Sequence, residues 1–481
     1  MTQATPPAAF DVEPPAPTGH PWLAWSVVAL MVAMLFAVRA FVPDRVKGAA
    51  ELERIVLEGQ VKYMVGAGQM VTAQQRKQLY EQLTTLLKGS LSDRLRLAVL
   101  AGELIGPAKA LAELEEVQEE LKRPEHLQEE AARQLATALD RLYRDYEAGK
   151  WDAPSLDADD RQLLIDELGW FGQLALAPAA GPDSDARQQV LAPAHRIMVV
   201  VLAGFAAFVM VGLAGLVGLV ALVIMLCGGW VRGSVAEQTG RGGIYAETFA
   251  LWMFLYLMLS VAAQFVLGDT VGLLAPATAM LVSLSALAWP VQRGVPWRLV
   301  RQDIGLLRGR GILVEALAGL ATYAMAIPMM VVGLLLTFLL MWIQSRVAPG
   351  AGFDPADPPS HPIAEMILHA GWWVRVQLLV LASVIAPLVE ETMFRGVLYR
   401  HLREATGRFG FIGSMLASGL LVSFVFAVVH PQGPLAVPAL MSLALAFTLA
   451  REWRGSLIAA MVAHGINNGV VMTLLISIAA A

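Results

Sequence analysis

The sequence predicts an all-α polytopic membrane protein with about nine transmembrane helices and one inserted helical soluble domain. Hydrophobic residues make up 57% of the 481 residues, charged residues only 16%, and the mean hydropathy is +0.58. This composition is typical of chains that cross a bilayer repeatedly. Apolar runs of span length recur over the second half of the chain, and strand-like alternation is scarce. The net charge of −5 argues against a nucleic-acid partner.

The N-terminal region combines a polar tail with an apolar segment. Residues 1–20 are rich in proline and alanine and lack lysine and arginine, which predicts a disordered tail. Residues 21–42 are apolar over a length that can span a bilayer. A cleaved signal peptide would need a basic region before this segment. We therefore expect an uncleaved transmembrane anchor.

Residues 43–195 have the pattern of a soluble helical domain. Charges are dense, apolar residues recur at helical spacing, and the segment is long enough for its own core. The sequence at 149–154 predicts a break between helices. No motif in this domain carries chemistry, so its role cannot be read. The predicted core stripes are Leu111, Leu114, Val117 and Leu121, followed by Leu135, Leu139, Leu142 and Tyr146.

Residues 196–481 are predicted to form a multi-helix membrane core, which makes the chain an integral membrane protein. Its only cysteine, Cys227, lies in an apolar run, so an intrachain disulfide is impossible. We expect spans at about 197–228, 244–267, 270–290, 312–343, 373–400, 411–430, 434–450 and 456–478.

The loops between these spans differ in charge. On one side, loops 229–243, 291–311, 395–410 and 451–455 carry thirteen arginines, whereas the other side carries only Arg346. The positive-inside rule places the arginine-rich side in the cytoplasm and the soluble domain outside it. The anchor alone disagrees, because its basic residues follow it.

The most informative stretch places Glu390, Glu391 and Arg395 inside an apolar run. A charge at a helix centre in lipid costs about 2.5–3.5 kcal/mol, so such residues usually face the bundle interior and have a function there. Glu391 and Arg395 are four apart and can pair on one face. Glu390 is turned by about 100° and is left free. The alternative is an ion cluster that only holds helices together.

Two further polar groups follow within apolar segments. The first is Phe426 with His430, and the second is His464 with Asn468. Each pair is four residues apart and shares a helical face, so Phe426 could wall the pocket of His430. Either histidine alone would be read as a buried core residue. Together with Glu390, these residues predict a single site.

A count of residues along the two spans places His430 and Glu390 at different depths in the membrane. At about 1.5 Å per residue, His430 lies at the far end of its span from Arg408, whereas Glu390 lies towards the arginine side of its own span. The two can meet only if one span is offset, tilted or broken. Pro387 is a suitable break.

In their order along the chain, the motifs E-E-x-x-x-R, F-x-x-x-H and H-x-x-x-N resemble those of the intramembrane CPBP proteases (CaaX protease and bacteriocin-processing, also called Abi). That family includes the eukaryotic CaaX prenyl endopeptidase. The resemblance covers about residues 371–481 and explains nothing before residue 195. It implies an intramembrane endopeptidase in a bacterial cytoplasmic membrane, which hydrolyses a peptide bond of a membrane-associated protein or peptide.

The resemblance leaves two mechanisms open. In the first, Glu390 is a general base that activates a water held with His430, and His464 and Asn468 donate hydrogen bonds to the oxyanion. Glu391 and Arg395 then orient the helix that carries the base. This version needs no cofactor, and we favour it.

In the second mechanism, Glu390, His430 and His464 are three ligands of a zinc ion and water is the fourth. A non-catalytic reading also stays open. The same buried polar residues could serve a membrane immunity or scaffold protein, or line the path of a transporter, although no clear internal repeat supports transport.

Overall fold

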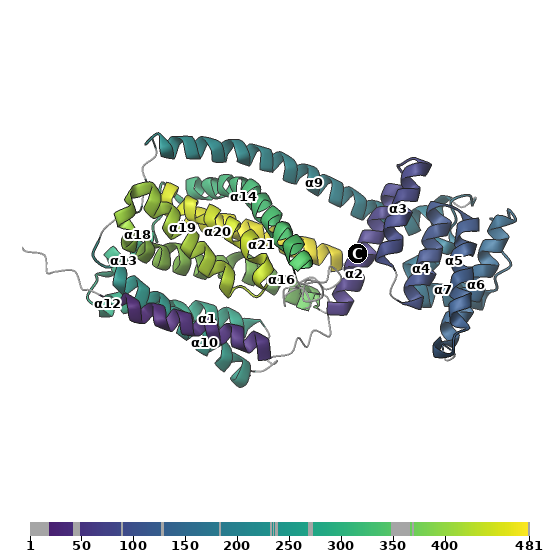
Figure 1. The fold of residues 1–481 in the computed structure, drawn as a ribbon, viewed down its shortest axis with the longest axis horizontal. Helices are drawn as coiled ribbons and strands as arrows, with labels where there is room; N and C mark the ends of the chain where they lie inside the picture. Colours follow the sequence, from purple (N-terminus) through teal and green to yellow (C-terminus); the bar gives the residue numbers. More distant parts are fainter. Residues whose placement is uncertain are drawn as a thin grey trace, which may run out of the picture. The chain divides into compact units, whose positions relative to one another are not determined.

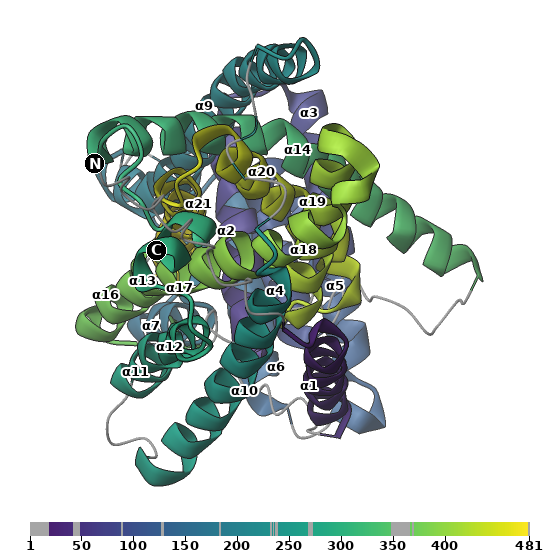
Figure 2. The same ribbon diagram turned by 90° about the vertical axis from the view of Figure 1, so that its left-hand side faces the viewer.

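The computed structural model describes residues 19–41, 49–87, 90–126, 129–181, 184–230, 233, 235, 239–267, 273–347, 366–367 and 370–479. Every regular element in these ranges is helical and none is a strand (Figures 1 and 2). This confirms the predicted all-α polytopic class. The chain divides into two compact units, Met1–Ala50 with Phe208–Ser477, and Glu51–Ala207 with the last four residues. Each unit is described by itself.

The unit of Glu51–Ala207 is a stack of short helices in which neighbours along the chain pack together, as α4 does with α5, and α5 with α6. Both predicted stripes form its core: all their residues are buried except Leu111, which is partly buried against the others. The helices are α2 (Ala49–Gly68), α3 (Ala73–Leu86), α4 (Leu91–Leu104), α5 (Pro107–Leu121), η1 (Pro124–His126), α6 (Glu130–Glu147), α7 (Ala158–Leu168), α8 (Trp170–Leu176) and the first half of α9 (Ser184–Cys227).

Local sequence explains where several of these helices begin. Thr72 caps α3 and Ser90 caps α4, each in a reciprocal capping box with the residue three positions on. The side chain of Asp157 accepts a hydrogen bond from a backbone N–H in the first turn of α7. Pro107 occupies the first position of α5, where a missing N–H has no cost.

The predicted break at 149–154 lies between α6 and α7, and Asp145 fixes it. The carboxylate of Asp145 accepts hydrogen bonds from the backbone N–H of Ser155 (2.6 Å), from its hydroxyl (2.5 Å) and from Lys150 (3.1 Å). These bonds, those from Ser155 first, lower the pKa of Asp145 to about 2. Trp151 in the same loop stacks on Tyr146 of α6. The loop is therefore held against the end of α6.

Within the described residues, eight helices are long and apolar enough to cross a membrane. The expected ninth, α1 (Pro21–Phe41), has a shorter described apolar stretch, Pro21–Ala37, and packs on α10 (Figure 1). The elements after α9 are α10 (Gly242–Leu267), α11 (Leu274–Ser283), η3 (Leu284–Leu287), α12 (Ala288–Gln292), α13 (Trp297–Ile304), α14 (Ile312–Val347), α19 (Gly410–Val429), α20 (Val437–Arg454) and α21 (Ile458–Ala479), with short 3₁₀ turns η6 (Gly407–Phe409) and η7 (Pro434–Ala436).

One span, Trp372–Ala405, is built from five consecutive helical segments. They are α16 (Trp372–Val380), the π-helical η4 (Leu381–Ile385), α17 (Ala386–Glu391), the π-helical η5 (Thr392–Leu398) and α18 (Tyr399–Ala405). The helix thus extends past the predicted boundary at residue 400. Arg395, Arg400 and Arg403, which were assigned to a loop, lie in this helix and are buried.

The membrane unit also contains ion pairs that the arginine count could not reveal. Arg403 binds Glu452 at 2.5 Å, Arg454 binds Glu315 at 2.8 Å, and Arg241 binds Asp303 at 2.9 Å. In two of these pairs the carboxylate accepts a further hydrogen bond from a tyrosine hydroxyl: Tyr399 donates to Glu452, and Tyr245 donates to Asp303. A buried charge is tolerated when it is paired and hydrogen-bonded. Part of the basic charge that suggested loops therefore joins helices instead.

Candidate active site

The two neighbouring glutamates lie on α17, between two π-helical segments. Proline has no N–H, so Pro387 leaves the carbonyl four residues before it, that of Ser383, without its helical donor. The π-helical η4 contains Ser383 and absorbs this disturbance. Such π segments are rare and occur often at functional sites. Pro387 is therefore the irregularity that the sequence suggested, although the helix continues through it.

Helix α21 covers the carbonyls of this irregular segment. The amide of Asn468 donates a hydrogen bond to the carbonyl of Ala382 at 2.9 Å. Gly465 lies so close to Ser383 that a Cβ there would be 2.5 Å from the Ser383 carbonyl oxygen. Only glycine allows this approach of the two helices. Asn468 and Gly465 thus hold α21 against the helix that carries both glutamates.

Glu391 lies at the centre of a fully buried cluster. Its Oε1 atom accepts hydrogen bonds from Arg395 Nη1 and from His464 Nδ1, both at 2.8 Å. The expected pair of Glu391 and Arg395 is thus present, and neither side chain is exposed. Arg395 also donates to the carbonyl of Ala444 on α20 at 3.1 Å. This cluster joins three segments distant in the sequence.

Glu390 faces the two imidazoles instead. Its Oε2 atom lies 3.8 Å from His430 Nε2 and 3.8 Å from His464 Nε2. Both distances are too long for a direct hydrogen bond and short enough for one water to bridge. The side chains of Glu390 and His430 are each 19% exposed, whereas that of His464 is 5% exposed. Of the two glutamates, Glu390 is therefore the accessible one.

His430 ends helix α19 because Pro431 follows it, and a residue before proline avoids the helical conformation. The backbone of His430 is extended, with φ −74° and ψ 147°. Its Nδ1 atom lies 2.6 Å from the carbonyl of Phe426, an unpaired carbonyl of the last turn. A carbonyl only accepts, so Nδ1 carries the proton. In the neutral ring, Nε2 is then the free acceptor that faces Glu390.

Two phenylalanines wall the site. The ring of Phe426 lies 4.1 Å from that of His430, in agreement with its predicted place, and it also contacts His464. Phe447 on α20 stacks on His464 at 5.1 Å. The guanidinium of Arg395 lies between both phenylalanines, 4.4 Å from Phe426 and 5.4 Å from Phe447. Phe447 has no signal in the sequence, because it is one apolar residue within an apolar run.

The sequence predicted that His430 and Glu390 lie at different depths in the membrane. The position at which the helix of Glu390 ends removes this difference. Because this helix continues to Ala405, Glu390 lies deeper in its span than the boundary at residue 400 implied. The structure therefore brings together Glu390, Glu391, Arg395, Phe426, His430 and His464. Asn468 touches the same helix at Ala382, and no contact with Glu390 is recorded for it.

The chemistry of the three candidate zinc ligands suits a metal, but their spacing does not. Two ligands of a tetrahedral zinc lie about 3.3 Å apart when each is 2.0–2.1 Å from the ion. Both imidazole-to-Glu390 distances are 3.8 Å. Among the described residues, no group of three His, Cys, Asp or Glu side chains is close enough to hold a metal ion. Each imidazole would have to approach Glu390 by about half an ångström for the two to share a zinc ion.

Residues 371–470 match the model of a protein family described as Rce1-like, type II CAAX prenyl endopeptidase Rce1-like. The matched segment contains Glu390, His430, His464 and Asn468. No curated protein and no solved structure matches the chain. The match confirms the resemblance that the three motifs indicated. Residues 371–470 of this integral membrane protein thus resemble the Rce1-like endopeptidases of the CPBP protease family.

Proposed function

We propose that this protein is an intramembrane endopeptidase that hydrolyses a peptide bond of a membrane-associated protein or peptide with a water activated by Glu390. One observation carries the proposal. The Oε2 atom of Glu390 lies 3.8 Å from two imidazole nitrogens, while Oε1 of the neighbouring Glu391 accepts hydrogen bonds from Arg395 and His464. One carboxylate is free to move a proton, and the other fixes the groups around it.

His430 and Glu390 together hold the attacking water. The water donates one hydrogen to Glu390 Oε2 and the other to His430 Nε2, which is the free acceptor of that ring. As its oxygen attacks the scissile carbonyl carbon, Glu390 takes its proton. The same carboxylic acid then gives this proton to the leaving amine. The carboxylate is thereby regenerated, and no further reactant is needed.

His464 stabilises the oxyanion through its Nε2–H. Glu391 accepts the Nδ1–H of His464, so a second proton on Nε2 makes this ring an imidazolium. The charges of Glu390, Glu391, Arg395 and His464 then sum to zero. The amide nitrogen of Asn468 uses one hydrogen for the carbonyl of Ala382, and its second hydrogen is the other oxyanion donor.

The test uses purified protein in nanodiscs and a library of peptides that carry a membrane-inserting segment or a lipid anchor. Mass spectrometry of the products should find new peptide ends at a restricted set of bonds. The same library should stay intact with the variant Glu390→Ala. A variant that inserts and folds normally yet yields the same ends would contradict an endopeptidase based on Glu390.

Removal of metal separates the two mechanisms. We expect hydrolysis to survive incubation with a strong zinc chelator, because both imidazole nitrogens lie about half an ångström farther from Glu390 than two ligands of one zinc ion would. Asn468→Ala should then lower kcat by about 10²–10³, the usual cost of one oxyanion donor. A zinc content of about one per chain, lost with activity and restored with it, would contradict the metal-free mechanism.

We also propose that the helical unit lies outside the cytoplasm. Arg293, Arg298, Arg301, Arg308 and Arg310 lie between the third and fourth spans, on the side opposite to the helical unit. In a chain with Cys227→Ser, a single cysteine at Asp152 should react with a membrane-impermeant maleimide on intact cells. A cysteine at Arg308 should react only after lysis. The reverse pattern would place the helical unit in the cytoplasm.

A further inference from the structure

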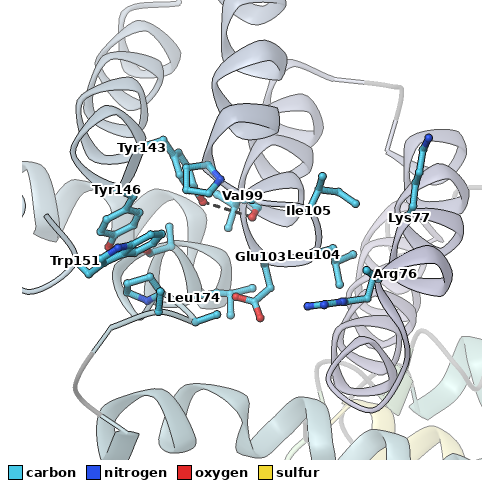
Figure 3. A pocket seen from close by; sticks show the side chains of 18 residues that line it. Arg76, Lys77, Val99, Glu103, Leu104, Ile105, Tyr143, Tyr146, Trp151 and Leu174 are labelled. Carbon is cyan, nitrogen blue, oxygen red and sulfur yellow. Dashed lines mark hydrogen bonds between the residues drawn. The ribbon is translucent and has the colours of Figure 1, made fainter. Parts of the chain in front are cut away.

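The unit of Glu51–Ala207 contains a cavity of about 370 Å³ (Figure 3). It lies where the start of α3, the turn between α4 and α5, the loop after α6 and the end of α8 meet. This volume falls within the range of small-ligand pockets, about 300–1,000 Å³. No motif pointed to this site, because its residues are spread over more than a hundred positions of the sequence.

Positive charge is in excess around the cavity. Glu103 is its acidic lining residue, and the carboxylate is already engaged by two hydrogen bonds from Arg187 (2.6 and 3.1 Å) and one from Gln69 (2.8 Å). Arg76 points its guanidinium towards the middle of the cavity (Figure 3). Its Nε atom is buried and has no hydrogen-bond partner among the described residues. Buried donors are almost always bonded in native proteins, so this guanidinium favours an anionic ligand.

The side opposite Arg76 is apolar and aromatic (Figure 3). Trp151 stacks on Tyr146 with ring centroids 5.1 Å apart and planes at 15°, and Leu174 lies beside them. The hydroxyl of Tyr146 is bound to the carbonyl of Ala175, so only the flat ring faces are offered. Such a wall fits an aliphatic or aromatic side chain.

The last turn of α4 borders the cavity. Helix α4 ends at Leu104, beside the cavity. The backbone N–H groups of both Ile105 and Gly106 bond to the carbonyl of Ala101. Carbonyls of the last turn have no N–H partner within the helix. A ligand that brings an amide N–H together with a carboxylate would therefore satisfy both kinds of group at this cavity.

We propose that this cavity binds an N-acylated α-amino acid with a free carboxylate and an apolar side chain, the chemistry found at the C-terminus of a peptide. Arg76 binds the carboxylate, Tyr146 and Trp151 hold the side chain, and the end of α4 accepts the amide N–H. Lys77, next to Arg76 on α3, also lines the cavity. This binding site is independent of the chemistry at Glu390.

The experiment uses the full chain with Glu390→Gln in nanodiscs, so that cleavage of the peptide is slow compared with the binding measurement. The probes are two fluorescein-labelled pentapeptides that end in leucine, one with a free carboxylate and one with a C-terminal amide. Fluorescence anisotropy should show saturable binding of the free acid, and at least about tenfold weaker binding of the amide, because the charge-assisted bond to Arg76 is lost. Equal affinities, or no saturable binding of the acid, would overturn the proposal.

Variants assign the binding to this cavity. The Nε atom of Arg76 has no hydrogen bond to lose, so Arg76→Gln should abolish the difference between acid and amide. Arg144→Gln is the matched control, because this exposed arginine of α6 pairs with Asp140 and does not line the cavity. Ala73→Trp, at the exposed first residue of α3, should block both probes. An acid preference that persists in Arg76→Gln would refute the site.

Competition with a small molecule distinguishes two kinds of ligand, the C-terminus of a peptide and a free acylated amino acid. N-acetyl-leucine carries the same carboxylate, amide and side chain as the last residue of the peptide. Competition only at a concentration at least about tenfold above the Kd of the pentapeptide would assign the site to peptide C-termini. Equal potency would support the carboxylate site and assign it to small acylated amino acids.

Discussion

Glu390→Gln should lower kcat by about 10²–10⁴, the usual contribution of a general base, with little change in KM. Glutamine has nearly the shape of glutamate but cannot accept a proton. The side chain is 19% exposed, and both imidazoles lie 3.8 Å from its Oε2 atom, beyond direct hydrogen-bond distance, so little stability should be lost. Measurement of kcat and KM on one identified peptide, together with thermal unfolding in the same nanodiscs, tests this prediction.

Glu390→Asp is the matched control for the role of the carboxylate. It keeps the base and withdraws it by about one methylene, so it should retain more activity than Glu390→Gln. Misplacement of a catalytic group by about 1 Å can cost about 10²-fold. If Glu390→Gln turned over peptide at the rate of the parent protein, Glu390 could not be the base.

The helical content and the pairing within the motif could be predicted from the sequence because both depend on local spacing. Apolar runs of span length identify the spans, and the spacing of four places Glu391 beside Arg395. The separation of Glu390 from its neighbour follows from the same helical geometry. The prediction that both histidines lie near Glu390 depended also on the order of the three motifs along the chain.

The remainder of the site depends on contacts between distant segments. Nothing in the sequence indicates that His464 shares Glu391 with Arg395, or that Asn468 binds the carbonyl of Ala382. The second contact joins α21 to the π-helical segment before Pro387, and the register of α21 against this segment is a tertiary property. Phe447 carries no polar signal at all.

The predicted end of the helix that carries Glu390 is wrong for a related reason. Arginines near a helix end suggest a loop. In this protein, Arg403 is buried because it meets Glu452, almost fifty residues further along the chain. The partner of Arg454 is Glu315, which is still more distant. Sequence spacing identifies pairs within one helix, whereas these pairs join separate helices.

Glu391→Gln should lower the free energy of unfolding by about 3–5 kcal/mol, the usual cost of removing one partner of a buried ion pair. Arg395 would keep its charge in a site with no solvent exposure, and the remaining contacts are the carbonyl of Ala444 and two phenylalanine rings. His464 would also lose the carboxylate that orients it. Equilibrium unfolding of the purified variant measures the loss, beside the small change expected for Glu390→Gln.

A double variant and a second ion pair test this explanation. Glu391→Leu with Arg395→Met removes both charges, and should be more stable than Glu391→Leu alone, since no unpaired arginine is left in the interior. Glu315→Gln is the matched control, because it breaks the pair with Arg454 outside the site, in which Glu315 is buried and the arginine side chain is 8% exposed. It should lose similar stability while its folded fraction keeps the parent kcat. The folded fraction of Glu391→Gln should lose kcat as well, because His464 is misplaced. Equal stability of Glu391→Gln and Glu390→Gln would refute the division of roles between the two glutamates.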